Sequence, residues 1–98
     1  MYKDIITYEL AEGVTEKHLF EVAEKVYSDW MKNQRGFLGW EINKNSNGSY
    51  TDIVMWETKE DNQLSNENMS TMKNSADWMA CYKMDTVKSF NVERLFNK

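Results

Sequence analysis

Apolar residues recur along this chain with two different spacings, which predict strands and helices in a definite order. The segment 3–10 (KDIITYEL) is rich in β-branched and aromatic residues, as strands usually are. After Thr15, a suitable N-cap, apolar residues follow the 3.6-residue period of an amphipathic helix. This is the clearest periodicity in the sequence, and its members are Leu19, Val22, Ala23, Val26 and Trp30. We expect this helix to end near Asn33.

Two extended runs with a turn between them predict a β-hairpin in the middle of the chain. Asn47 and Gly48 both tolerate positive φ, so this pair is a strong turn signal between strands at 37–43 and 49–57. Thr58 then resembles the N-cap of a second helix. The Asn-rich, weakly periodic sequence that follows does not define where that helix ends.

The last third of the chain predicts a short helix and a final strand. Ser75 resembles the N-cap of a helix from Ala76 to about Met84, and 88–96 (KSFNVERLF) is typical of a strand. The complete order is strand, helix, strand, strand, helical segment, strand, without a repeat or a linker. We therefore predict an α+β, ferredoxin-like βαββαβ fold with a four-stranded antiparallel sheet and helices on one face. Residues 1–98 are expected to form one such domain.

The predicted strands carry apolar side chains on both faces of the sheet. Successive side chains of a strand point to opposite faces, and neighbouring apolar pairs recur: Ile5 and Ile6, Phe37 and Leu38, Ile53 and Val54, Met55 and Trp56, and Leu95 and Phe96. Helices can cover only one face, so we expect a homodimer that buries the other, sheet against sheet. The alternative is a monomer, because polar residues interrupt the second face: Thr7, Glu9, Glu41, Asn43 and Glu57.

The composition is that of a folded protein, with 41% hydrophobic and 13% aromatic residues. Its net charge is -4 at pH 7 with scattered Lys and Arg, which disfavours nucleic acids and anionic membranes as partners. The single cysteine, Cys81, cannot form an internal disulfide and indicates a reducing compartment. There is no signal-peptide pattern, and no apolar run approaches about 18 residues. We expect a cytoplasmic protein.

The stretch SADWMACY (75–82) gathers aromatic and sulfur-containing side chains. In a helix, Trp78, Cys81 and Tyr82 share one arc, which should face the sheet. Trp78 and Tyr82 are therefore candidates for the lining of a pocket that stacks on a flat aromatic ligand. The same residues are equally expected in an ordinary core, because an aromatic pocket and a core with a void look alike in sequence.

Residue types that carry acid–base, nucleophilic or metal chemistry are sparse. Cys81 is expected to be buried and inert, since it lies inside a predicted helix and only Lys83 is close. His18 is the only histidine and is expected on the surface; one His and one Cys do not make a usual transition-metal set. Five carboxylates lie on predicted strands without a spacing that pairs two of them for acid–base work: Asp4, Glu9, Glu41, Asp52 and Glu57.

The βαββαβ order, RGFLGWEI at the second strand, VMWETKED at the end of the third and SADWMACY together resemble the antibiotic-biosynthesis-monooxygenase-like family. The resemblance covers nearly the whole chain. It implies ferredoxin-like subunits that pair into a dimeric α/β barrel, with a pocket between sheet and helices in each subunit. Family members include cofactor-independent monooxygenases of polyketide phenols or quinols, haem-degrading enzymes and proteins without a known reaction. Fold alone does not choose among them.

This sequence lacks three residues that are typical of the haem-degrading members of the family. Their axial His corresponds to Tyr82, their Trp before the short helix corresponds to Met72, and their first-strand Asn has no counterpart in DIITYEL. Tyrosine can ligate haem, but the other two departures remain. We therefore expect no haem, and the sequence indicates no other cofactor or metal.

Two functions remain open at this point. The first is a monooxygenase-like enzyme that oxidises a small aromatic or quinol-type substrate without metal or flavin. Its pocket candidates are Tyr8, Trp40, Trp56, Trp78 and Tyr82. The two tyrosines offer hydroxyls, and Trp40 and Trp56 are expected on central strands. The sequence assigns no catalytic base. The second is a non-catalytic dimeric domain that binds a small molecule or serves in a stress response.

Overall fold

The computed structural model describes residues 1–98, and its elements follow the predicted order. The strands and α-helices are β1 (Tyr2–Tyr8), α1 (Glu16–Asp29), β2 (Phe37–Lys44), β3 (Tyr50–Trp56), α2 (Lys59–Asn68), α3 (Ser75–Met79) and β4 (Lys88–Glu93). Short 3-10 helices lie at η1 (Met31–Asn33), η2 (Met69–Thr71) and η3 (Met84–Thr86). None of the helices has the length and apolar character needed to cross a membrane.

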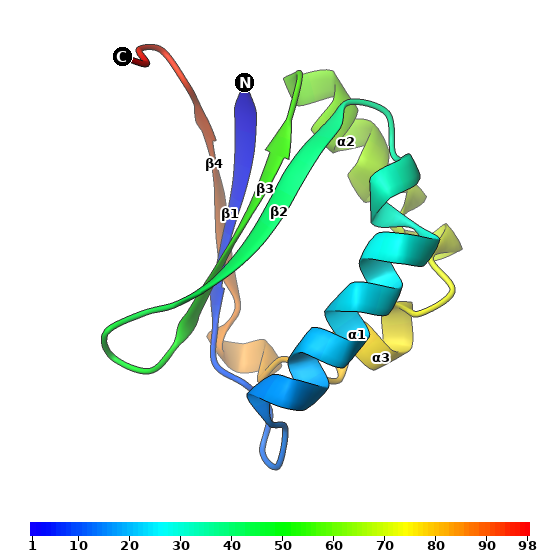
Figure 1. Ribbon diagram of the computed structural model, residues 1–98, viewed down its shortest axis with the longest axis vertical. Coiled ribbons are helices and arrows are strands. Elements are labelled where there is room, and N and C mark those ends of the chain that lie inside the picture. The colour runs from blue at the N-terminus through cyan, green and yellow to red at the C-terminus, as the bar shows by residue number, and fades with distance from the viewer.

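The four strands form one antiparallel sheet in the order β2-β3-β1-β4, and the helices pack on one of its faces (Figure 1). The predicted α+β, ferredoxin-like βαββαβ fold is therefore confirmed. Trp40 was expected on a central strand, and this is wrong, because β2 is an edge of the sheet. Trp56 lies on β3, which has a neighbour on both sides.

Local capping explains where the first two α-helices begin. The Thr15 side chain accepts a hydrogen bond from the His18 backbone N–H, and the Thr58 side chain accepts one from the Asp61 N–H. Both predicted N-caps are confirmed. The α-helical part of the first helix ends at Asp29, and η1 completes the predicted span.

The prediction for the third helix is wrong at both ends. Ser75 is the first helical residue and Asn74 is in the N-cap position, while the helix stops at Met79 and does not reach Met84. It stops because the next residues bond to the segment after β1. Leu10 and Tyr82 form an isolated antiparallel bridge, and the Cys81 carbonyl accepts from the Ala11 N–H at 2.9 Å.

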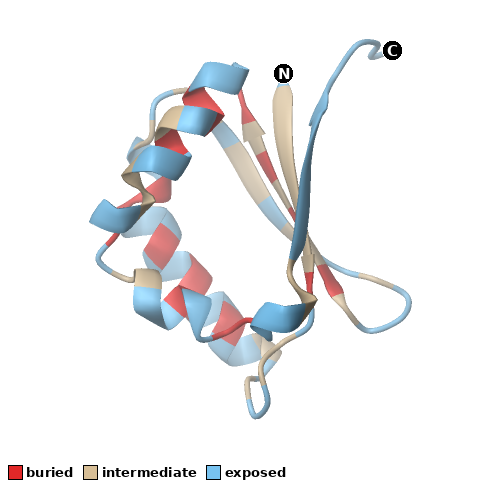
Figure 2. Cartoon of the chain, turned by 180° about the vertical axis from the view of Figure 1, so that it is seen from behind, coloured by how far each residue is buried: buried red, intermediate tan, exposed pale blue.

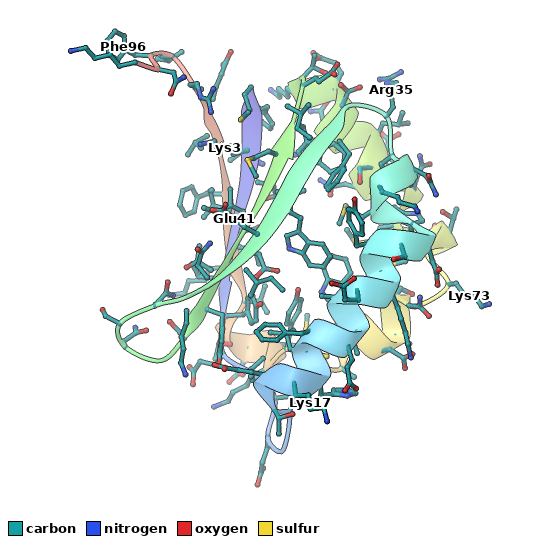
Figure 3. All side chains as sticks on the ribbon, in the orientation of Figure 1. Lys3, Lys17, Arg35, Glu41, Lys73 and Phe96 are labelled. Carbon is teal, nitrogen blue, oxygen red and sulfur yellow. The ribbon has the colours of Figure 1, made fainter.

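The final strand also ends earlier than predicted, at Glu93. Its partner β1 begins at Tyr2, and the last backbone contact along this edge is from the Arg94 N–H to the Met1 carbonyl. The chain beyond that point has no strand to pair with. Phe96 projects from this end of the sheet, away from the helices (Figure 3).

The core lies between the sheet and the helices. Along β3, the buried residues Tyr50, Asp52, Val54 and Trp56 alternate with half-buried ones, as expected for a strand with one fully covered face. Buried side chains of α1 pack against them, and the buried positions of the helices and of β3 face each other (Figure 2). This inner face of the sheet positions the candidate site.

The outer face of the sheet carries a row of apolar side chains. Ile5 pairs with Ile53 on one side and with Phe90 on the other, so the three side chains cross three strands on the face away from the helices. Strand β4 is exposed along its whole length (Figure 2), and the Phe90 side chain is 58% exposed. No other element of this chain covers that face.

Candidate functional site

A cavity of about 140 Å³ lies between the inner face of the sheet and the helices α2 and α3. We call it the inner cavity. Eleven of its 15 lining residues are hydrophobic, and the polar ones are Asp4, Asn62, Ser65 and Asn66. Its aromatic wall includes Trp56, Trp78 and Tyr82, three of the five residues that the sequence indicated.

Three polar atoms in the wall of the inner cavity are buried without a hydrogen-bond partner. They are Nε1 of Trp56, Nε1 of Trp78 and Oδ1 of Asn62, and they are the only buried side-chain nitrogen or oxygen atoms in the chain without one. A buried polar group left unpaired costs about 1–3 kcal/mol. Among the residues that line the inner cavity, two donors and one acceptor therefore remain that a ligand or water could satisfy.

A cluster of hydrogen-bonded polar side chains lies next to this cavity, with Asp52 at its centre. Asp52 is only 1% exposed. The Tyr8 hydroxyl donates to its Oδ1 at 2.7 Å, the Trp40 indole donates to its Oδ2 at 3.2 Å, and the Tyr82 hydroxyl donates to Oδ2 at 3.5 Å. The rings of Tyr8 and Tyr82 lie 4.3 Å apart. We call these four residues the Asp52 cluster.

The Asp52 cluster contains a buried carboxylate without a cation. The two ion pairs of the chain, Arg35–Asp61 and Lys44–Glu16, lie elsewhere. Burial raises the pKa of Asp52 to about 6, although its hydrogen bonds from Tyr8, Trp40 and Tyr82 act in the opposite direction. Burial, followed by the Asp52 charge, raises the pKa of the Tyr82 hydroxyl, which therefore stays neutral at physiological pH.

The structure divides the five predicted pocket residues between these two groups. Trp56, Trp78 and Tyr82 line the inner cavity, whereas Tyr8 and Trp40 do not. Tyr8 and Trp40 instead meet Tyr82 at Asp52. Tyr82 is thus the one residue that belongs to both the cavity wall and the Asp52 cluster.

A wider groove of about 390 Å³ lies between α1 and the edge strand β2. Phe20, Ala23, Tyr27, Trp40 and Ile42 line it, and Glu24 is its one non-hydrophobic residue. None of the unpartnered buried polar atoms faces this groove. Despite its smaller volume, the inner cavity is therefore the better candidate site, because specific recognition needs polar groups aimed at the ligand.

Two polar residues of the site were missed by the sequence analysis. Asp52 gave a signal, since the alternation of YTDIVMW places it on the same face as the apolar and aromatic Tyr50, Val54 and Trp56. Asn62 gave none, because α2 is Asn-rich and weakly periodic. Its burial arises from the packing of α2 over the sheet, which local sequence does not encode.

The remaining candidate residues lie outside the site. Cys81 is fully buried, and burial followed by the charge of Asp77 raises the pKa of its thiol, as for an inert core cysteine. His18 is exposed on α1. No three His, Cys, Asp or Glu side chains lie together in a way that could hold a metal ion.

Solved structures named as antibiotic biosynthesis monooxygenases share this fold over nearly the full length of the chain. A protein from Bordetella bronchiseptica that is assigned by name to these monooxygenases has a TM-score of 0.79 at 13% identity, with 97% of each chain covered. No protein-family model matches the sequence, and no curated protein matches it.

Two further structures with this fold are oxygenases by name. SnoaB from Streptomyces nogalater, a cofactor-independent oxygenase, has a TM-score of 0.76 at 10% identity, with 98% of this chain and 94% of SnoaB covered. The ActVA-Orf6 monooxygenase of Streptomyces coelicolor, solved in complex with nanaomycin D, has a TM-score of 0.74 at 16% identity, with 99% and 89% covered. At these identities the similarity is one of fold.

Proposed function

We propose that this protein is a cofactor-independent monooxygenase that oxidises a small aromatic, quinol-type substrate in the inner cavity. The observation that carries the proposal is that Trp56, Asn62 and Trp78, each with a buried polar atom that lacks a partner, line the same aromatic-walled cavity. A hydroquinone offers a ring for stacking, an O–H for the Asn62 carbonyl and oxygen acceptors for the indole N–H groups. The fold shared with SnoaB and ActVA-Orf6 supports oxygenase chemistry.

The size of the inner cavity favours a single ring. Its volume of about 140 Å³ is close to the roughly 150 Å³ of an apolar cavity that accommodates benzene. A one-ring hydroquinone fits this space, whereas a fused tricyclic compound requires the wall to open. We therefore expect monocyclic hydroquinones and catechols to be better substrates than polycyclic ones.

The proposed reaction needs only the substrate and dioxygen. A hydroquinone and O₂ give a hydroxyquinone and water: one oxygen atom enters the ring, and the other leaves as water. All four electrons that reduce O₂ come from the substrate. The two phenolic hydrogens become those of the water, and the hydrogen of the attacked ring carbon becomes that of the new hydroxyl group. The role of the protein is to bind the ring, exclude water and help to remove a proton.

We also propose that the protein functions as a homodimer. The apolar row of Ile5, Ile53 and Phe90 on the outer face supports this, since soluble monomers rarely expose large contiguous apolar patches. Leu95 and Phe96 beyond β4 are 90% and 81% exposed, which adds apolar surface at the same edge strand. A second copy of the chain would cover this surface, and the inner cavity lies on the opposite side of the sheet.

Oxygen uptake with a panel of hydroquinones tests the proposed function. Trp78→Phe keeps an aromatic ring but removes the N–H, so we expect kcat/KM to fall about tenfold, the loss that corresponds to one hydrogen bond. Tyr27→Phe, in the α1–β2 groove, is the matched control and should retain wild-type uptake. Absence of uptake with every hydroquinone would refute the proposal. Quenching of tryptophan fluorescence without uptake would instead indicate a binding protein.

A further inference from the structure

We infer that Asp52 is the proton acceptor of this site and that Tyr82 connects it to the inner cavity. This inference rests on the proposed function, because it assigns a role in the deprotonation of a phenolic ligand. Asp52 itself does not line the inner cavity. A proton from a bound phenol therefore reaches it through another side chain.

The hydrogen bonds around Asp52 leave Tyr82 as the only connection. Tyr8 and Trp40 also donate to the carboxylate, but neither lines the inner cavity. Tyr82 lines the cavity, and its hydroxyl donates to Asp52 Oδ2 at 3.5 Å. A hydroxyl can accept one proton while it donates its own, so this geometry is that of a two-step proton relay.

A buried carboxylate without a cation is costly, and the three hydrogen bonds that Asp52 accepts offset only part of that cost. The titratable groups that face it are Tyr8 from β1 and Tyr82 from the segment after α3. The charged side chains of α1 are not buried, and on α2 the buried Asp61 is paired with Arg35. Such uncompensated groups occur preferentially at functional sites, and a pKa of about 6 suits a base that works near neutral pH.

The proposed step balances in protons and charge. The phenolic O–H bond breaks and its proton moves to the Tyr82 oxygen, while the Tyr82 proton moves to Asp52 Oδ2. Asp52 becomes neutral, Tyr82 keeps its original state, and the negative charge passes to the phenolate. The N–H group of Trp56 has no partner in the chain and can donate to the phenolate oxygen, which lowers the energy of the anion. The anion then gives electrons to dioxygen more readily than the neutral phenol does.

Asp4 is the competing assignment, since it lines the inner cavity directly. It is half-buried, and burial raises its pKa as well. Its Oδ1 accepts a hydrogen bond from the Asn91 amide at 3.4 Å on the exposed β4 side. Asp4 therefore has no hydroxyl relay and lies close to the solvent-exposed edge. Substitution of Asp4 and of Asp52 by asparagine, one at a time, shows which of the two carboxylates accepts the proton.

Binding of 4-nitrophenol, whose ionised form absorbs visible light, tests the relay without any turnover. At about pH 6, where Asp52 is about half ionised, we expect the wild type to bind this probe with a phenolate band. Asp52→Asn and Tyr82→Phe should each lower the bound phenolate fraction about tenfold, the effect of one pKa unit. Asp85→Asn, an exposed carboxylate on η3, is the matched control and should keep the band.

Three results would overturn the assignment. They are a phenolate band that persists in both Asp52→Asn and Tyr82→Phe, a band that is lost only in Asp4→Asn, and a wild type that does not bind the probe. Tyr82→Phe keeps the ring, so it reports on the relay even if Asp52→Asn does not fold. A normal probe response without oxygen uptake would refute the proposed oxygenase and leave the relay standing, so the two failures are distinguishable.

Discussion

At the scale of single residues, Asp52 should govern how the stability of the protein changes with pH. Its pKa is about 6 in the folded protein and 3.8 as an ordinary carboxyl. Between these values the folded state therefore holds the proton more tightly than the unfolded chain. The resulting stabilisation is complete below about pH 4 and is lost as the pH rises through about 6. A shift of about two units corresponds to about 3 kcal/mol.

Urea unfolding of the wild type and Asp52→Asn between about pH 4 and pH 7 measures this contribution. The free energy of unfolding of the wild type should fall by about 3 kcal/mol relative to that of the variant over this range. Other titrating groups, such as Asp61, whose pKa is lowered by Arg35, contribute equally to the wild type and the variant. Their contributions therefore cancel in the difference between the two free energies of unfolding. A difference between the two proteins that does not change with pH would contradict the description of Asp52.

Residue types were easier to predict than residue partners. The aromatic residues of the site were identifiable because Trp78 and Tyr82 share a helical arc and Trp56 lies on an apolar strand. Asp52, the hydrogen-bond partner of Tyr82, is 30 residues before it in sequence and meets it only through the tertiary packing of the segment after α3 on the sheet. Contacts of this kind follow from tertiary structure, so no local pattern predicts them.

At the scale of elements, Gly36 controls how β2 and α2 meet. Its φ of +76° lies in the left-handed region, and a Cβ there would collide with the Asp61 carboxylate, which lies in the first turn of α2 next to Asn62. Gly36→Ala should cost about 3 kcal/mol or more, because about 1–2 kcal/mol arises from the backbone and the rest from displacing Asp61 from Arg35.

Gly13 is the matched control for this effect. Its φ of +82° is similar, but a Cβ there meets no atom within 4 Å. Gly13→Ala should therefore lose only the backbone contribution of about 1–2 kcal/mol in urea unfolding. Equal losses in the two variants would show that the Asp61 contact does not matter.

Elements with a local signal were predicted well, and those that depend on distant contacts were not. Thr15 and Thr58 are caps whose hydrogen bonds reach only three residues along the chain. The end of α3, in contrast, is set by the bridge between Tyr82 and Leu10, which are far apart in sequence. The edge position of β2 likewise follows from the order of the strands in the sheet.

At the scale of the whole molecule, the outer face of the sheet should determine the oligomeric state. Light scattering at micromolar concentration is expected to give twice the chain mass of 11.6 kDa for the wild type. Phe90→Lys places a charge in the apolar row and should give a single-chain mass. Ser89→Lys, on the opposite face of β4, should remain a dimer. A wild type of one chain would contradict this account of the outer face.

The most direct test of the inner cavity as the ligand site is an experimental structure of the protein with bound 4-nitrocatechol. We expect the ring between the sheet and α2, with its oxygens within hydrogen-bond distance of Nε1 of Trp56 and Trp78 and one hydroxyl directed at Asn62 or Tyr82. A ring bound in the α1–β2 groove beside Trp40, or an inner cavity whose polar atoms bind only water, would contradict the account.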